Sequence, residues 1–471
     1  MSSKAEIAIV GAGPAGLTLA LALARRAMAS GHDSSGGGIA VTVYDKQPSH
    51  FLAQRFDVDR SYTIDITGHG RKALEYVHAT DVFDEALFEF KGLIYHHLPN
   101  VSFLPVNRID AVTEESPGYT GSRGDICRAL QQIIEEKFSG VVAFCWETGV
   151  SVESDDTGTL VEERTSGGRT VSTRSKAFDL IVGADGAGSV VRAAVERFDP
   201  TFYIQKRSTS KYCTMMELDK AETVGKELSP EWLQVFNVIP LSVAGAVGGG
   251  LGRGSARWFC QFGFTRDTIF SNVEEVKRHL RHCSPKLLDL VTDEEMEKFI
   301  ERKCQHIGRS VSCNPLRSGR FVLLGDAACA FPPIGQGVNA AMESAMVLDQ
   351  CIGRVWNSFT SGSEPATVVF CQALNDFDAE WRPSTDALVW LGDHLWSGNV
   401  MWMLCKGMFS SKLGLGVLSR SKDRTLSYYD VMTEAIAMEQ RLRYTGWAVG
   451  ALGVLGVGLT LRTLSPRQFL R

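Results

Sequence analysis

Short, largely apolar runs recur along the chain, and each ends in a turn that contains glycine or aspartate. They occupy residues 7–10, 39–44, 180–183 and 320–324. An apolar run of this length between turn residues is typical of a strand that is buried on both faces of a parallel sheet. The segment at 17–26 is rich in Ala and Leu and contains no helix breaker, so it predicts a helix directly behind the first strand.

The pattern changes between about 202 and 270, where apolar and polar positions alternate and aromatic residues are frequent. This alternation predicts a second sheet, whose aromatic side chains either fill its own core or roof a ligand. Residues 274–280 and 285–300 predict helices that are charged on one side. The stretch at 387–418 is rich in Trp, Met and Leu, and forms either a helical core or an apolar access route or interfacial surface.

The first glycine motif, GAGPAG at 11–16, stands between the first strand and its helix. Gly11 permits a tight turn, Gly13 lets a phosphate approach the backbone, and Gly16 lets the helix pack close to the strand. The free N–H groups at the start of the helix favour a pyrophosphate. The motif predicts a dinucleotide site; a glycine turn without a ligand is the alternative.

Asp45 follows the second strand, and its carboxylate is suited to an adenosine ribose hydroxyl. It comes later than the usual interval of about 20 residues. The stretch at 28–38 is rich in Ser and Gly, and predicts a surface loop that accounts for the excess.

The third motif follows the last strand. Asp326 stands at the carboxyl end of that strand, where open α/β sheets bind their ligands, and it is placed to hold the hydroxyls of a ribityl chain. The segment GQGVN at 335–339 then opens a predicted helix at 340–348, whose N-terminus favours an anion such as the pyrimidine end of a reduced flavin. An ordinary strand–loop–helix connection is the alternative.

A middle motif lies between these two. Asp185 and Gly186 turn the chain after the third strand, and Ser189 caps a predicted helix that starts near Val190. This turn alone is common, but its position between the other two motifs is informative. The three motifs in this order predict a pocket for FAD.

The order of motifs resembles that of the FAD-dependent aromatic hydroxylases, the family that includes p-hydroxybenzoate hydroxylase, over residues 1 to about 370. Segments at 60–64, 70–74 and 332–339 are similar to blocks of its kynurenine 3-monooxygenases. The resemblance implies flavin contacts at Arg60 and Arg123, although Arg123 would equally suit a solvated surface position. With these two, the expected cofactor contacts are Gly11, Gly13, Ala15, Gly16, Asp45, Lys46, Arg60, Arg123, Asp185, Gly186, Gly325, Asp326, Pro333, Gly335, Gly337, Val338 and Asn339.

The resemblance also implies a reaction. NADPH, or NADH, reduces the flavin, O₂ adds at flavin C4a, and the resulting hydroperoxide hydroxylates an aromatic ring. Kynurenine 3-hydroxylation is the candidate reaction. We expect Gly335 and Gly337 to donate their backbone N–H groups to the flavin and Pro332 to shape the face where oxygen reacts. No metal is required by this chemistry, and no metal-ligand cluster is visible in the sequence.

The chain departs from the family pattern in two places. Cys329 stands where the family usually has His, which should alter the packing of the flavin loop without abolishing binding. The arginine that would grip the carboxylate of kynurenine is replaced by Lys91, with Tyr95 nearby, and lysine is a point charge rather than a bidentate fork. Tyr428 or Tyr429 lies where the resemblance implies a substrate-binding tyrosine.

We therefore predict an α/β fold with a discontinuous Rossmann-like FAD-binding domain, a mixed β-sheet substrate domain and a helical C-terminal region. The FAD-binding domain is discontinuous because its third motif lies some 300 residues after its first. The predicted boundaries are 1–200 and 306–370 for the FAD-binding domain, 201–305 for the substrate domain, 371–440 for the helical region and 444–461 for a membrane anchor.

The anchor prediction depends on 18 uncharged residues at 444–461 with arginines on both sides. A span requires about 20 apolar residues, so the segment is at the short end, and a buried or interfacial helix is the alternative. The resemblance implies membrane binding through such a tail, with the catalytic domain facing the cytosol, at the outer mitochondrial membrane if the protein is of the kynurenine type.

Composition excludes some other functions. A net charge of −5 provides no electrostatic case for nucleic acid, and 11 cysteines without a CxxC pair favour reduced thiols. No secretory signal is expected. The expected partners are a small aromatic substrate and O₂, and the oligomeric state is left open. The alternatives to a hydroxylase are a membrane-associated epoxidase or prenyl-chain reductase acting on a lipid-like substrate, and a flavin-bearing interaction protein with little turnover.

Overall fold

The structure of the 471-residue chain is a computed structural model. It describes residues 4–29, 38–52, 63–95, 108–109, 118–154, 158–166, 169–221, 228–238, 245–250, 257–362, 364–395, 417–441 and 444.

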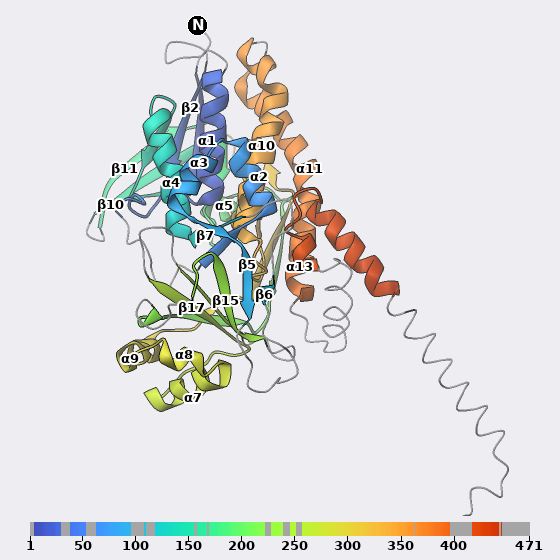
Figure 1. Cartoon of the computed structure of the whole chain (residues 1–471). Helices are drawn as coiled ribbons and strands as arrows, with labels where there is room; N and C mark the ends of the chain where they lie inside the picture. Colours follow the sequence, from blue (N-terminus) through green and yellow to red (C-terminus); the bar gives the residue numbers. More distant parts are fainter. Residues whose placement is uncertain are drawn as a thin grey trace, which may run out of the picture.

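A six-stranded sheet forms the centre of the nucleotide-binding part (Figure 1). Its strands in spatial order are β20 (Arg317–Ser318), β21 (Phe321–Leu323), β12 (Leu180–Gly183), β1 (Ala5–Val10), β2 (Ile39–Tyr44) and β8 (Val142–Cys145). All pairs are parallel except the edge pair of β20 and β21. Strands from segments more than 300 residues apart therefore meet in one sheet, as the motif order predicts.

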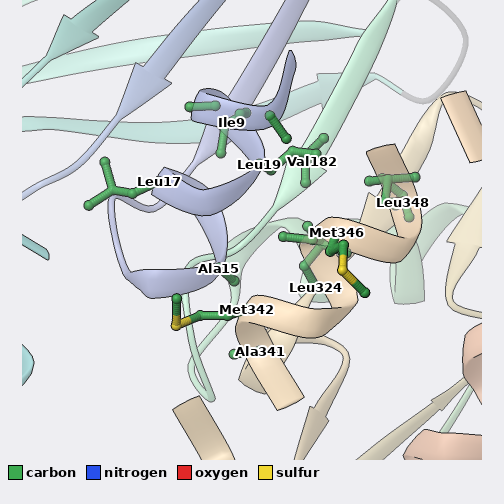
Figure 2. Close-up of a cluster of buried hydrophobic side chains, with 14 of the residues drawn as sticks. Ile9, Ala15, Leu17, Leu19, Val182, Leu324, Ala341, Met342, Met346 and Leu348 are labelled. Carbon is green, nitrogen blue, oxygen red and sulfur yellow. The ribbon is translucent and has the colours of Figure 1, made fainter. Parts of the chain in front are cut away.

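Helices α1 (Pro14–Ala29) and α10 (Gly337–Thr360) pack against each other beside this sheet. Figure 2 shows their contact, in which Leu19 and Met346 lie with Ile9 and Val182 of the strands. Both helices are longer than predicted. In α10 the reason is that apolar side chains beyond the predicted end at 348 also become buried in this core. Helix α10 begins at Gly337, within the predicted opening segment.

Several further elements surround the sheet. The helices are α2 (Gly68–Tyr76), α3 (Thr80–Ala86), α4 (Arg123–Lys137), α5 (Val190–Phe198), α11 (Ala366–Leu395), α13 (Val417–Arg420) and a helix over 428–441, with a 3₁₀ turn at Gly325–Ala327. The small sheets are β9 (Thr148–Ser154) with β10 (Thr159–Ser166) and β11 (Arg169–Ala177), β13 (Tyr203–Ser208) with β19 (Arg309–Asn314) and β22 (Cys329–Ala330), and β3 (Thr63–Ile66) with β7 (Gly118–Ser122) and β4 (Phe88–Phe90).

A seven-stranded mixed sheet forms the second layer. In spatial order it contains β18 (Gln305–His306), β14 (Tyr212–Glu217), β17 (Trp258–Phe264), β16 (Gly245–Gly250), β15 (Trp232–Val238), β5 (Gly92–Tyr95) and β6 (Arg108–Ile109). Strands β5 and β15 are parallel, and the other pairs are antiparallel. Strand β16 also contacts β3 and β7, which places this sheet next to the nucleotide-binding part.

Most of the aromatic residues predicted for this region are core residues. Phe236 and Phe262 are buried, and Phe262 packs against Phe299 of a helical cap. Tyr203 is an exception, with 62% of its surface exposed. The cap contains α7 (Val273–Cys283), α8 (Lys286–Asp289) and α9 (Asp293–Glu301). The single helix predicted at 285–300 is therefore wrong, because Thr292 caps a new helix by accepting a hydrogen bond from Glu295 N.

The predicted fold class is confirmed: an α/β fold with a discontinuous Rossmann-like part, a mixed sheet and a helical C-terminal region. In the part of the chain that the structure describes, no helix combines the length and apolarity that a membrane crossing requires. The predicted anchor at 444–461 lies outside the described residues except for Tyr444, and so does most of the stretch at 387–418.

A largely buried polar cluster joins α1, α2 and α10. Arg26 forms an ion pair of 2.5 Å with Asp349, which also accepts a hydrogen bond of 2.5 Å from the Tyr76 hydroxyl. The Asp349 side chain is 2% exposed. The side chain of Arg26 is 21% exposed, so removal of this carboxylate takes a negative charge away from a guanidinium that is partly withdrawn from water.

We predict that Asp349→Ala destabilises the protein by about 3 kcal/mol, seen as a lower midpoint of urea unfolding. The control is Glu294→Ala, which removes an exposed i,i+4 partner of Lys298 and should cost about 0.5 kcal/mol or less. Equal midpoints for the two variants would show that the cluster contributes no more than a surface pair.

Candidate cofactor site

A cavity of about 390 Å³ opens at the carboxyl ends of β1, β2, β12 and β21. Residues of all three motifs line it, although they are separated by more than 300 positions in the chain. The predicted cofactor contacts in this lining are Gly11, Gly13, Ala15, Asp45, Lys46, Arg123, Asp185, Gly186, Gly325, Asp326, Gly337 and Val338.

Gly11 and Gly16 occupy positions that exclude a side chain. Gly11 has a φ of +107°, and a Cβ atom there would lie 2.4 Å from the carbonyl oxygen of Ala184. A Cβ atom at Gly16 would lie 2.0 Å from the carbonyl oxygen of Gly11. The turn between β1 and α1 is therefore closed by backbone contacts, and the N-terminus of α1 lies against the cavity.

Asp45 organises this turn from the end of β2. One carboxylate oxygen accepts the N–H of Ala12 at 2.9 Å, and the other accepts the N–H of Gln47 at 2.8 Å. Carboxylate oxygens have further lone pairs, so Asp45 also remains suited to a ribose hydroxyl.

Arg123 begins α4, which Ser122 and Asp125 cap in a reciprocal capping box. Its guanidinium lies next to Gly13, where a Cβ atom would be 3.1 Å from Arg123 Nη2. The helix thus brings a cation to the phosphate-binding turn, and of the two readings of Arg123 the cofactor role is the one this position supports.

Asp326 faces the cavity from the 3₁₀ turn that follows β21. Burial raises the pKa of this carboxyl, and the positive charges of Arg123 and Arg192 offset part of that effect. No other described residue donates a hydrogen bond to this carboxylate, so both oxygens are available to hydroxyl donors. This availability is what a ribityl-binding residue requires.

Asp185, on the turn of the middle motif, is in an environment similar to that of Asp326. Its Oδ2 accepts the N–H of Val190 at 2.6 Å, and its Oδ1 is buried without a hydrogen-bond partner among the described residues. Burial raises the pKa of this carboxyl as well. Ser189 caps α5, as predicted, by accepting the N–H of Arg192 at 2.9 Å.

The sequence did not single out Arg192, which ties two motifs together. This buried side chain donates to the carbonyl oxygen of Ala327 at 2.8 Å and to that of Ala187. The first oxygen belongs to the third motif and the second to the middle motif. The only local signal was an arginine on the apolar side of a helix, which is buried here because backbone carbonyls surround it.

His50 was also missed. Its ring lines the cavity, with Nε2 2.7 Å from the carbonyl oxygen of Ala12, and burial lowers its pKa. A single histidine in a loop with Ser and Pro carries no recognisable signal in the sequence.

The flavin loop, which we define as residues 332–339, leads into α10. Gly335 has a φ of +75°, and its carbonyl oxygen accepts hydrogen bonds from the side-chain amides of Gln336 at 3.0 Å and Asn339 at 3.1 Å. Asn339 also bonds Asp65 O and Thr67 N, which fastens the loop to β3 and α2. Pro332 contacts α11 at Gly392.

Cys329 packs just before this loop. The thiol is buried, donates to the carbonyl oxygen of Thr385 on α11 at 3.3 Å, and has a pKa raised by burial. In this environment Cys329 is a neutral packing group.

The predicted substrate contacts are dispersed. Lys91 forms an ion pair of 2.6 Å with Glu231, and its ammonium is thus already compensated. Tyr428 is fully buried, whereas Tyr429 is 48% exposed. The side chain of Tyr95 and the whole of Arg60 lie outside the described residues. These roles stay predictions.

The cavity fits FAD in the kinds of group that it presents. Gly11 and Gly13 allow close backbone approach, two helix N-termini and Arg123 suit the pyrophosphate and the flavin pyrimidine, and carboxylates suit the hydroxyls.

Comparison with known proteins also indicates FAD binding. The sequence profile of a family described as FAD binding domain matches residues 130–359. The kynurenine 3-monooxygenase of Salinispora tropica is 25% identical over 99% of this chain and 98% of its own length. That of Candida albicans is 23% identical over 74% of this chain and 73% of its own length. The chain is an FAD-dependent monooxygenase that resembles the aromatic hydroxylases.

The fold of this FAD-dependent monooxygenase is also similar to solved structures. Tetrameric 2-methyl-3-hydroxypyridine-5-carboxylic acid oxygenase superposes with a TM-score of 0.61 at 18% identity, over 90% of this chain and 97% of that one. At this identity the similarity concerns the fold alone.

We predict that Asp326→Ala weakens FAD binding about 10- to 100-fold, because hydrogen bonds to a charged group contribute about 1.5–3 kcal/mol. The measurement is the flavin absorbance of the purified protein together with FAD titration of the apoprotein. Asp267→Ala, at an exposed loop position, is the control. Full flavin retention in Asp326→Ala would contradict the role assigned to this carboxylate.

Proposed function

We propose that this protein hydroxylates a small aromatic substrate, with NADPH or NADH as electron donor and O₂ as oxygen donor, and that L-kynurenine is the first substrate to test. The observation that carries the proposal is the convergence of three FAD motifs on one cavity beside a mixed sheet. The two relatives described above, both kynurenine 3-monooxygenases, support this choice of substrate.

Bound FAD would carry electrons from the nicotinamide to O₂, a transfer that the aromatic substrate cannot bring about by itself. The protein's contribution is binding and orientation. Asp45 and Arg123 would hold the adenosine and pyrophosphate portion, Asp326 the ribityl hydroxyls, and the N-terminus of α10 the flavin ring. The mixed sheet would exclude water from the side of the flavin loop, because β16 contacts β3 and Asp65 of β3 is bonded to Asn339.

Recognition of an amino-acid substrate would involve Lys91, which precedes β5, and Tyr95, at the end of that strand. Because Glu231 pairs with Lys91, a substrate carboxylate would have to compete with that glutamate for the ammonium. The pair would also offer an acceptor to a substrate ammonium, so a zwitterion suits it better than a simple carboxylate does. The predicted membrane anchor, with the catalytic domain facing the cytosol, belongs to this proposal and stays a prediction.

The test uses the full chain, purified in detergent, with FAD, NADPH, O₂ and L-kynurenine. We expect a product heavier by one oxygen atom, formed in proportion to the NADPH consumed. A parallel reaction with 2-methyl-3-hydroxypyridine-5-carboxylate controls for hydroxylation of any aromatic acid.

Three results would redirect the assignment. Hydroxylation of the pyridine alone would retain the hydroxylase and replace the substrate. NADPH oxidation that yields only peroxide with both compounds would contradict an aromatic substrate of this class. In a separate reaction with a prenyl-chain compound, a gain of two hydrogen atoms would favour the reductase alternative.

A further inference from the structure

The C-terminal segment at 417–441 packs against the flavin loop, although the sequence separates the two by about 80 residues. One polar contact joins them directly, and a second joins the segment to β3 beside the loop. The Tyr428 hydroxyl donates to Gln336 Oε1 at 3.2 Å, and Lys422 forms a buried ion pair with Asp65. Asp65 Oδ1 lies 3.5 Å from the position that a Cβ atom would take at Gly335.

Gln336 has a defined part in the conformation of the loop. It is fully buried at the start of α10, and its Nε2 donates to the carbonyl oxygen of Gly335 at 3.0 Å. The carbonyl oxygen of Gly335 can only accept, so the amide nitrogen faces Gly335 and the amide oxygen faces the Tyr428 hydroxyl, which donates to it. Tyr428 therefore restrains the amide that bonds Gly335, a residue with a φ of +75°.

The ring of Tyr428 is itself held in place. It stacks on His69 with ring centroids 4.2 Å apart, and Trp381 meets it edge-on at 6.3 Å. His69 Nδ1 lies 2.7 Å from Glu343 Oε2, and Lys72 lies 3.1 Å from Glu343 Oε1. Because Glu343 belongs to α10, the ring that reaches Gln336 is fixed to the same helix that the flavin loop opens.

We propose that Tyr428 is a positioning residue for the flavin loop: through Gln336 it fixes the backbone of Gly335, and so the orientation of the loop N–H groups toward the flavin. This role differs from the substrate contact that the sequence suggests for Tyr428, since the side chain is fully buried and its hydroxyl is engaged by Gln336. The proposal rests on the proposed function only for its turnover readout; its cofactor readouts depend on FAD binding alone.

The first test is Tyr428→Phe, which keeps the ring and its stacking and removes the hydroxyl. We expect FAD to bind the apoprotein about five-fold or more weakly, at the lower end of the range typical of coupled sites. We also expect a shift in the visible absorption spectrum of the bound flavin. If hydroxylation is established, a larger fraction of consumed NADPH should end as peroxide.

The matched control is Tyr76→Phe. It removes a tyrosine hydroxyl bonded to Asp349 of the same helix, about 18 Å further along α10 than Gly337. This variant should lower stability without changing the flavin spectrum or the affinity for FAD. Equal effects of the two variants on the flavin would overturn the proposal.

A double-mutant cycle tests whether Tyr428 acts through Gln336. Gln336→Met should reproduce the changes of Tyr428→Phe, and the double variant should show little more than Gln336→Met alone. Additive effects on FAD affinity, or an unaltered flavin in Gln336→Met, would overturn the proposal. Gln336→Met reads the same contact from its other end, so it decides the question even if Tyr428→Phe fails to fold.

Discussion

The backbone contact between the first motif and the middle motif is the constraint on which the cofactor site depends. A Cβ atom at Gly11 would lie 2.4 Å from the carbonyl oxygen of Ala184, so the two turns meet without a side chain between them. Gly11 N donates to Tyr44 O and Ala184 N to Val10 O, each at 2.7 Å. These bonds extend the register of three parallel strands into their turns, and the motifs converge because their strands are adjacent.

The turn of the third motif is joined to the first two turns by one backbone hydrogen bond and by the side chain of Arg192. Leu324 N donates to Gly183 O at 2.9 Å, which continues the sheet, and Arg192 then bridges the two turns through Ala187 O and Ala327 O. A buried guanidinium with carbonyl acceptors is stabilised by them and holds both loops in one arrangement. Its positive charge also offsets part of the rise in the pKa of Asp326.

Helix α10 then transmits this arrangement to the rest of the molecule. Its first turn carries the flavin loop, Glu343 meets the cluster around His69, and Asp349 pairs with Arg26 of α1. One helix therefore connects the cofactor cavity, the C-terminal segment and the helix of the first motif. Its buried side chains keep these three sites at fixed positions along one helix.

The sequence by itself determined the cofactor and the fold class. Local rules were sufficient for both, because a glycine without a Cβ atom, an apolar run and a helix start each have their effect within a few residues of the chain. The predictions of β2 at 39–44 and of the Ser189 cap needed nothing more. The tertiary structure alone decided the roles of Arg192, His50 and Tyr428. Each of these side chains acts on a group distant in sequence, and the burial that gives it its partners exists only after the sheets and helices have packed.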